Sequence, residues 1–462
     1  MAKTKPLSVF SLVMINIIAI DNIRSLPASA EFGLTLISYY FAMAILFFIP
    51  IALVSAELAT ALPKKGGVYA WVREAFGPRW GCYVIWLQWI YNVVWYPTQM
   101  AFIAAVISHF FPGNLSENPY FISGLSFLLF TVATIANNYG MRISSFVSTL
   151  GAIFGTLIPM MLITLCALLW VYQGHPVEFM QNNVSWLPST GDKSHIGYLS
   201  LVIFGLVGIE MSAVHAEEVE NPQKSYPKAI AISTLVIMST LVISSLSIAT
   251  ILPPNELNIM TGVIQVFNRV IEVSLPSSLN WIHYVLNTLI IFGSLSAVSA
   301  WIIGPSKGLM VAANEGAAPN VLKKENRYGA PINILILQII VFTCLCSTYH
   351  FLPIQTAFFM LTAFTDQLAM IGYIFLLAAA FFLRHQSPHL QPKYKVPGGI
   401  IGMAITCVLG FIGCIIGLAA GFMLPDNLQG ISATTYVFII LFGIVIISLP
   451  PILFKHRKQE PL

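Results

Sequence analysis

Long apolar runs alternate with short polar stretches along the whole chain. Twelve of these runs hold the roughly 20 mainly apolar residues that a helix needs to cross a bilayer. They lie at residues 8–33, 36–61, 80–111, 119–137, 146–173, 196–216, 228–252, 281–313, 331–350, 352–383, 399–424 and 431–454. The polar stretches between them are too short for a soluble domain. The pattern predicts an all-α polytopic membrane protein with about 12 transmembrane helices, in one domain at 1–454 with a short tail at 455–462.

The first run is interrupted in its middle. It contains the sequence IDNIRSLP, from Ile20 to Pro27, which places an acid and a base where only hydrocarbon is expected. Proline has no backbone N–H to donate, and aspartate and asparagine side chains compete for backbone hydrogen bonds. We therefore expect the helix to open here. The residues that the opening would present to the inside of the bundle are Ile20, Asp21, Asn22, Arg24 and Ser25.

The sixth run is interrupted in a similar way. Gly205 and Gly208 weaken its helix, and Glu210 follows at membrane depth. Phe204, just before the glycines, would give the opening an apolar or stacking wall. An ionisable residue inside a membrane usually faces a cavity or a partner. Glu210 is therefore either a gate carboxylate or a packing partner in a kinked helix.

The two interruptions lie five runs apart, which suggests a common origin. Irregular backbone at membrane depth is tolerated where it lines a cavity or is buried in protein. Paired interruptions at corresponding positions of two halves point to a transporter site between inverted repeats. The repeats would span about 8–173 and 196–383, followed by two further helices at 399–454. Substrate would bind where the interrupted helices meet.

Composition and charge agree with a membrane protein and give its orientation. Hydrophobic residues make up 57% of the chain and charged residues 9%, against roughly 25% charged in soluble domains. Of the 22 Lys and Arg residues, 18 fall on one side of the predicted topology, two (Lys193 and Arg269) fall on the other, and two (Arg24 and Lys307) lie within runs. This bias places both termini in the cytoplasm and predicts a multi-pass protein of the cell inner (plasma) membrane. The basic residues are too dispersed for nucleic acid.

Metal, cofactor and enzyme chemistry find little support. The six cysteines all lie in apolar runs without a CxxC pair, so they are interpreted as small core residues. The sequence HAEE at 215–218 differs from the HExxH zinc motif. We predict no catalytic residue, no metal and no cofactor. A membrane-embedded enzyme using scattered acids and histidines, or a sensor of transporter fold, is a less favoured alternative.

Several side chains are candidates for contact with a small-molecule substrate. Arg24 would bind a carboxylate, although an ion pair with Asp21 or Glu31 is the competing interpretation. Asp21 would meet an amine, carry a coupled proton if burial favours its neutral form, or cap the first helix. Tyr91 and Trp95 in the third run are aromatic candidates, as are Thr365 and Asp366 deep in the tenth. Each of these also fits ordinary core packing.

Three ordered segments resemble the amino acid–polyamine–organocation transporter superfamily. The segment AELATALPKKGGVYAWVREAFGPRWG at 56–81 resembles its connection between helices 2 and 3. The segment FGLVGIEMSAVHAEEVENPQKSYPKAI at 204–230 resembles its helix 6 motif, and GPSKGLMVAANEGAAPNVLKKENRYGAP at 304–331 resembles the end of helix 8 and its following loop. Within the superfamily, residues 47–60, 212–227 and 299–313 are most similar to the glutamate/GABA antiporter branch.

The resemblance implies more than the apolar pattern does. It implies a five-plus-five inverted-repeat fold of the leucine-transporter type, and sodium-independent exchange of amino acids or related amines. It also implies a pathway tryptophan on helix 8, which would be Trp301. The sequence departs from the pattern of these transporters at two places. The tail after helix 12 is short and lacks the C-terminal pH plug of the branch, and IDNIRSLP replaces the usual glycine-rich break in helix 1. Membrane lipid and the substrate are the expected partners, protons are a candidate coupling ion, and the choice between exchange and proton symport stays open.

Overall fold

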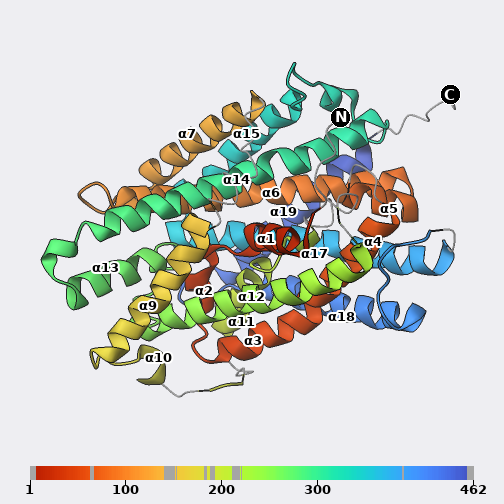
Figure 1. Ribbon diagram of the computed structural model, residues 1–462. Helices are drawn as coiled ribbons and strands as arrows, with labels where there is room; N and C mark the ends of the chain where they lie inside the picture. Colours follow the sequence, from red (N-terminus) through yellow and green to blue (C-terminus); the bar gives the residue numbers. More distant parts are fainter. Residues whose placement is uncertain are drawn as a thin grey trace.

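The computed structural model is a bundle of long helices (Figure 1). It describes residues 7–62, 67–139, 151, 153–181, 185–187, 193–210, 219, 221–387 and 390–454. Within these residues there is no β-strand, only an isolated bridge between Leu7 and Val219. The predicted all-α fold class is therefore confirmed.

Ten helical segments are long and apolar enough to cross a membrane, and α1 with its continuation forms an eleventh, bent one. Apart from that bent segment, the spans are α3 (Thr35–Met43) with η2 (Ala44–Phe48) and α4 (Ile49–Ala61), α6 (Pro78–Ser108), α7 (Pro119–Asn138), η4 (Ile153–Leu157) with α9 (Ile158–Tyr172), α12 (Pro222–Ile251), α14 (Ile282–Asn314), α15 (Ile332–Cys346) with α16 (Thr348–Phe351), α17 (Ile354–Gln386), α18 (Gly399–Ala420) and α19 (Ala433–Leu453). Each coincides with a predicted run to within a few residues at most ends.

One predicted span is only partly described. The sixth run, 196–216, begins as α11 (Lys193–Phe204) and continues to Glu210, and residues 211–218 lie outside the described part of the chain. The start of the fifth run at 146–150 and the tail at 455–462 also lie outside it. About 12 spans were predicted, and the described residues contain eleven helical segments that could cross a membrane.

The structure adds short helices that the apolar runs do not predict. The helices α5 (Val68–Phe76), α10 (Glu178–Gln181) and α13 (Gly262–Ser274) lie in connections. The sequences of α5 and α13 mix apolar and charged residues, so they never form a continuous apolar run. The helix α12 begins at Pro222, earlier than the predicted residue 228, and its start is explained by the residues at that point. Asn221 adopts a left-handed backbone with φ 48°, and proline suits the first helical position.

Polar contacts show which helix ends gather at the same end of the bundle. At one end, the Arg79 guanidinium donates to the Ile452 carbonyl and the Asn326 amide donates to Asn138. At the other end, the Tyr198 hydroxyl donates to Asn427. The start of α6 therefore lies beside the end of α19, and the end of α7 lies beside the connection that precedes α15.

Apolar side chains cover the outside of the bundle as well as its core. Figure 1 shows α7 and α15 on one flank and α3 and α18 on the opposite one, with α1 and α17 between them. The helix α6 is buried along almost its whole length, whereas outer helices expose large apolar side chains such as Phe41, Leu235, Ile401 and Phe438. A water-soluble protein seldom exposes so much apolar surface. The chain is an integral multi-pass membrane protein.

Candidate functional site

The first interruption separates α1 (Val9–Ile20) from η1 (Ile23–Ser25) and α2 (Leu26–Ala30), and the axis bends by 45°. Asp21 and Asn22 adopt extended backbone conformations between the two pieces. The Asn22 side-chain oxygen accepts the Arg24 N–H at 3.0 Å, and the Ser25 hydroxyl donates to the Asn22 carbonyl at 2.8 Å. The Asn22 amide also donates to Gln99 of α6 at 3.2 Å. These local side-chain bonds replace the helical ladder, as the sequence predicts.

The second interruption follows α11. The helix ends at Phe204, and Gly205 to Gly208 form turns. Gly208 has φ +124°, a region that side chains rarely adopt, and a Cβ there would lie 3.2 Å from the Ala19 carbonyl oxygen. A Cβ on Gly205 would lie 3.5 Å from the Ser25 hydroxyl oxygen. The glycines thus allow the two interruptions to pack directly against each other.

A cavity of about 50 Å³ lies where they meet. Its lining is Ala19, Ile20, Asn22, Arg24, Ser25, Tyr91, Asn92, Trp95, Phe204, Gly205, Val207 and Trp301. The structure therefore brings together most of the predicted binding residues. Asp21, Gly208, Glu210, Thr365 and Asp366 are not among the lining residues, although Gly208 packs behind the end of α1.

Among the described residues that line this cavity, Arg24 is the only one with a charged side chain. Its side chain is buried, with 3% of the residue exposed. One guanidinium nitrogen donates to the Thr98 and Thr362 hydroxyls, each at 3.2 Å, and the rings of Phe204 and Phe358 lie 5.8 and 5.3 Å from the guanidinium carbon. These partners hold the cation in place, and none of them carries a negative charge.

The predicted alternative of an internal ion pair at Arg24 is not what the structure shows. Ion pairs among the described residues join Arg73 to Glu315, Arg269 to Glu256, and Arg384 to Glu57. Neither Asp21 nor Glu31, both in the described part, pairs with Arg24. Asp21, which is not among the lining residues, instead accepts the Thr240 hydroxyl of α12 at 3.0 and 3.2 Å. The two charged side chains of the first interruption are therefore bound to different helices.

An aromatic wall from α6 and α14 closes another side of the cavity. The rings of Trp95 and Trp301 meet at 6.4 Å in an edge-to-face arrangement. The Tyr96 hydroxyl donates to the Trp301 carbonyl at 3.0 Å, which fixes α6 against α14. Such a wall offers apolar area and π faces to a small ligand.

Glu210 lies at a second, smaller cavity of about 20 Å³ toward α5. The Tyr373 hydroxyl of α17 donates to the Glu210 carboxylate at 2.7 Å and accepts the Gly208 N–H at 3.2 Å. Tyr91 lines both cavities. Tyr91, Glu210 and Tyr373 therefore form a partition between the first cavity and the end of the bundle that carries α5. Glu210 is packed in this conformation, where it is hydrogen-bonded to Tyr373 of α17.

The tenth run contributes to the site through residues other than the two selected from sequence. Thr365 bonds its own helix at the Leu361 carbonyl. Asp366 faces α18, where a Cβ on Gly417 would lie 3.5 Å from its carboxylate. The residues of α17 that reach Arg24 are Phe358 and Thr362.

The residues missed by sequence reasoning are mostly uncharged. Thr98, Gln99, Thr240, Phe358 and Tyr373 each contact a predicted residue, but threonine, glutamine and aromatic residues are ordinary in helices. Only the tertiary structure shows which of them face an interruption. Tyr373 is the clearest case, because it belongs to α17 and bonds to residues more than 160 positions earlier.

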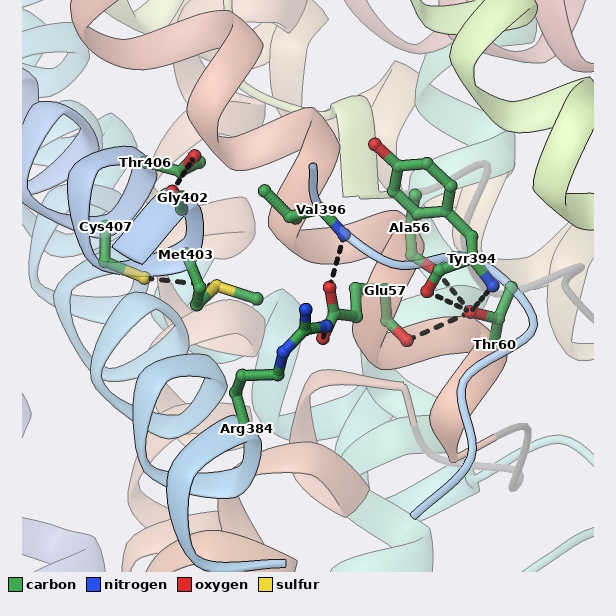
Figure 2. Close-up of polar contacts among 10 residues, drawn as sticks. All are labelled: Ala56, Glu57, Thr60, Arg384, Tyr394, Val396, Gly402, Met403, Thr406 and Cys407. Carbon is green, nitrogen blue, oxygen red and sulfur yellow. Dashed lines mark hydrogen bonds and ion pairs between the residues drawn. The ribbon is translucent and has the colours of Figure 1, made fainter. Parts of the chain in front are cut away.

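At the end of the bundle that carries α5, an ion pair ties α17 to α4 (Figure 2). Arg384 donates to one oxygen of Glu57 at 2.5 Å, and the Val396 N–H donates to the other at 2.6 Å. The Tyr394 N–H donates to the Thr60 hydroxyl at 3.1 Å. Burial raises the pKa of Tyr394 to about 12. These hydrogen bonds thus hold the connection between α17 and α18 against the end of α4.

A second polar cluster joins α5 to the end of α14. Arg73 and the Tyr69 hydroxyl both donate to the Glu315 carboxylate. The hydrogen bond that Arg73 donates to Glu315 raises the pKa of Arg73, while burial and the same carboxylate raise the pKa of Tyr69. Both groups therefore keep their protons at neutral pH. No three His, Cys, Asp or Glu side chains converge as metal ligands in the described residues.

Comparison with known proteins places this geometry in context. A family model described as amino acid permease matches residues 5–448. An uncharacterized transporter of Legionella pneumophila is 43% identical over 99% of this chain and 98% of its own length. A glutamate/gamma-aminobutyrate antiporter of Lactococcus lactis is 27% identical over 97% of this chain and 90% of its own. A D-serine/D-alanine/glycine transporter of Escherichia coli is 25% identical over 80% and 77%.

Proposed function

The chain belongs to the amino acid permease family and is a transporter, and we propose that it is a sodium-independent antiporter of amino acids that carry a carboxylate. Substrate would bind in the cavity between the interruptions of the first and sixth spans and cross by alternating access. The single observation that carries the proposal is Arg24, a buried cation that lines this cavity and is unpaired with any carboxylate among the described residues.

The proposed architecture follows from the two interruptions. Helices 1–5 (about 8–173) and 6–10 (196–383) would form two inverted repeats, with helices 11 and 12 (399–454) added to a single domain of 1–454. The distribution of basic residues, 18 against two, supports cytoplasmic termini in the cell inner (plasma) membrane. On this orientation α4 and α17 end on the cytoplasmic side, and the Tyr91–Glu210–Tyr373 partition is an inner gate.

Arg24 would bind the substrate carboxylate. A buried guanidinium without a counter-ion is costly, and it has donors left to offer a carboxylate in a two-pronged contact. Its Nε atom has no hydrogen-bond partner within the described part of the chain. Thr98, Thr362 and the two phenylalanine rings would keep the guanidinium aimed at the cavity.

The substrate amine would bind at the opposite side of the cavity. Both α1 and α11 are 12 residues long and end at the interruptions, so two helix C-termini converge there. Helix C-termini carry partial negative charge on unsatisfied carbonyl groups. An ammonium group suits them, and the pair of opposite poles suits an α-amino or ω-amino acid.

The charge of the cavity also separates amino acids from diamines. The described residues of the cavity lining include the Arg24 cation and no Asp or Glu. A second ammonium group would be repelled. The similarity to a glutamate/gamma-aminobutyrate antiporter supports the same choice. We therefore favour acidic and neutral amino acids over polyamines as substrates.

The size of the cavity supports alternating access. A cavity of about 50 Å³ has room for about four water molecules, which is less than an amino acid occupies. The surrounding elements must move apart to admit a substrate. Tyr91 and Glu210 are placed to open toward α5 when Tyr373 releases Gly208.

The test is counterflow in liposomes. Protein is reconstituted, the liposomes are loaded with one unlabelled compound, and uptake of its labelled form is followed for amino acids, γ-aminobutyrate and putrescine. We expect uptake of amino acids that requires substrate on both sides and is unchanged when choline replaces Na⁺. Putrescine should give no signal. Counterflow of putrescine alone would refute the substrate class.

Arg24→Ala tests the docking role. Loss of a buried charge-pair partner weakens binding by roughly 30-fold or more, so the substrate concentration for half-maximal counterflow should rise by that factor. Lys307→Met is the matched control, because Lys307 is the other base within a predicted run and does not line the cavity. Unchanged transport of every carboxylate-bearing substrate in Arg24→Ala would remove Arg24 from the site.

Proton-coupled amino acid symport is the second candidate. It is favoured by buried acids near the site, in particular Asp21 and Glu210. A symporter would accumulate substrate in empty liposomes under an inward pH gradient, whereas an obligate antiporter would not. The two candidates are therefore separated by uptake without internal substrate.

A further inference from the structure

The connection between α17 and α18 contains a short segment, residues 392–396, in which burial alternates from one residue to the next. The buried residues are Pro392, Tyr394 and Val396, and the exposed ones are Lys393 and Lys395. We call this stretch the basic segment. Because its lysines are exposed while the residues beside and between them are buried, the two lysine side chains point away from the protein.

Backbone hydrogen bonds hold the buried face of the basic segment on α4. The Val396 N–H donates to Glu57 at 2.6 Å, and the Tyr394 N–H donates to the Thr60 hydroxyl at 3.1 Å, as Figure 2 shows. Only 3% of Val396 and 4% of Tyr394 are exposed. The two lysines therefore occupy a defined place at the end of the bundle.

These lysines have no acidic partner in the described part of the chain. The ion pairs there join other residues, and Glu57, which accepts the Val396 N–H, already pairs with Arg384. No Asp or Glu occurs in the sequence between Asp366 and Asp426, a stretch that includes the whole connection and all of α18. The basic segment thus presents two positive charges, and its sequence neighbours offer no negative one.

The helix α18 continues the basic segment with an apolar outer face. It begins at Gly399 and is long and apolar enough to cross a membrane. Exposed apolar side chains recur along it at spacings of four and three residues, which places them on one face of the helix. They are Ile401, Ile405, Val408 and Ile412, with exposed fractions between 41% and 70%. The two lysines therefore lie where the lipid-facing surface ends, at the depth of the lipid headgroups.

We propose that the basic segment and the apolar face of α18 form a binding site for an anionic phospholipid. The headgroup phosphate binds Lys393 and Lys395, whose ammonium groups are compact donors that suit phosphate. An acyl chain follows Ile401 and Ile405 along α18. A zwitterionic lipid binds more weakly, because the basic segment has no acid to pair with its cationic group. The inference does not depend on the transport activity, so it stands or falls by lipid binding.

A bound lipid has a consequence for stability. The basic segment joins α17 to α18 and is hydrogen-bonded to α4, so a lipid on its exposed face braces three helices together. A ligand that binds only the folded state raises stability as its concentration rises. The midpoint of thermal unfolding should therefore rise with added anionic lipid.

The test measures lipid binding to the purified full-length protein in detergent. Dioctanoyl phosphatidylglycerol is titrated, and native mass spectrometry gives the fraction of protein that carries lipid. Dioctanoyl phosphatidylcholine is the zwitterionic comparison and should bind more weakly. The double variant Lys393→Gln/Lys395→Gln removes both charges. Since each basic residue at an anionic lipid surface contributes about fivefold in affinity, the Kd for phosphatidylglycerol should rise about 30-fold.

The double variant Lys323→Gln/Lys324→Gln is the matched control. These adjacent lysines lie in another connection, between α14 and α15, where Glu325 follows them directly. The control should keep the Kd within about threefold of wild type, as for ordinary surface substitutions. The thermal midpoint without lipid checks that both double variants fold. Added phosphatidylglycerol should raise this midpoint in wild type and in the control, and should leave it unchanged in Lys393→Gln/Lys395→Gln.

Three results would overturn the proposal. The first is equal affinity of wild type for phosphatidylglycerol and phosphatidylcholine. The second is an equal loss of affinity in the two double variants. The third concerns glycerol 3-phosphate, which carries the phosphate without acyl chains and should not displace bound lipid at equal concentration. Displacement would show that the basic segment binds a soluble phosphate compound instead of a lipid.

Discussion

The ion pair between Glu57 and Arg384 gives the most quantitative prediction. It joins α4 to α17, the helix that also contacts Arg24 and Glu210, so its strength bears on the stability of the whole site. Its geometry is close, with Nη1 and Oε1 at 2.5 Å. The exposed fractions of the two side chains are 5% for Glu57 and 16% for Arg384. We consider Arg384→Met, which keeps the apolar stem of the side chain, Glu57→Gln, and the double variant.

The burial of each partner sets the expected magnitudes. Arg384→Met leaves the buried Glu57 carboxylate with only the Val396 N–H as donor. Leaving one charge of a buried pair unpaired costs about 3–5 kcal/mol, and the remaining N–H argues for about 3 kcal/mol. Glu57→Gln leaves Arg384 unpaired but nearer to water, for which we expect about 1.5 kcal/mol. The double variant has no uncompensated charge and should lose about 2 kcal/mol, well below the sum of the single losses.

The assay is reversible unfolding by sodium dodecyl sulfate in mixed micelles, followed by tryptophan fluorescence. The four proteins give a coupling free energy, which we expect to be about 2.5 kcal/mol. Losses that add to within about 0.5 kcal/mol would refute the reasoning. They would mean that the two charges are hydrated independently and that α17 is held to α4 by packing alone.

Three further substitutions test the local structure around the site, each by the same unfolding assay with a matched control. Gly208→Ala places a side chain at φ +124° and 3.2 Å from the Ala19 carbonyl oxygen, so we expect the free energy of unfolding to fall by about 1–3 kcal/mol. The control Gly124→Ala, whose Cβ would meet open space in a helix, should be neutral or stabilising, and equal effects of the two substitutions would disprove strain at Gly208. Tyr373→Phe removes one donor to the Glu210 carboxylate and one acceptor for the Gly208 N–H, at a cost of about 2–4 kcal/mol. Tyr198→Phe, at the opposite end of the bundle, should cost less, and the reverse order would contradict the partition. Thr240→Val removes the donor to Asp21 and should lower the free energy of unfolding by about 1–3 kcal/mol. The control Thr250→Val, whose hydroxyl bonds only its own helix, should be close to neutral. A neutral Thr240→Val would show that Asp21 does not depend on this bond.

Hydrophobic patterning was sufficient to predict the long helices. Each of them makes its backbone hydrogen bonds within itself, so the length of the apolar run alone decides which residues form the helix. The helix α18 is a case, since its predicted and observed starts coincide at residue 399. Patterning did not predict α5 and α13, in which one apolar face alternates with charged residues. The opening at Asp21 was predictable because proline, aspartate and asparagine disfavour a helix through local interactions that require no knowledge of the fold.

The partners of the ionisable residues were beyond sequence reasoning. Arg24 and Asp21 are three positions apart, which made an ion pair between them a reasonable expectation. The interruption separates them, because extended backbone at Asp21 turns its carboxylate toward Thr240 of α12 while Arg24 reaches Thr98 and Thr362. Sequence distance says nothing about which way a side chain leaves an irregular segment. Only the packing of α6, α12 and α17 around that segment decides it.

The separation of charges in this bundle has a functional consequence. An ion pair between Asp21 and Arg24 would have neutralised the guanidinium and left the cavity with no electrostatic preference. With Asp21 bonded to Thr240 of α12, the cation at the cavity is left for a ligand. Arg24 would then recognise a carboxylate, while Asp21 holds the first interruption to α12. A substitution of Thr240 should therefore lower stability without removing the guanidinium that binds substrate, whereas Arg24→Ala should weaken the binding of substrate.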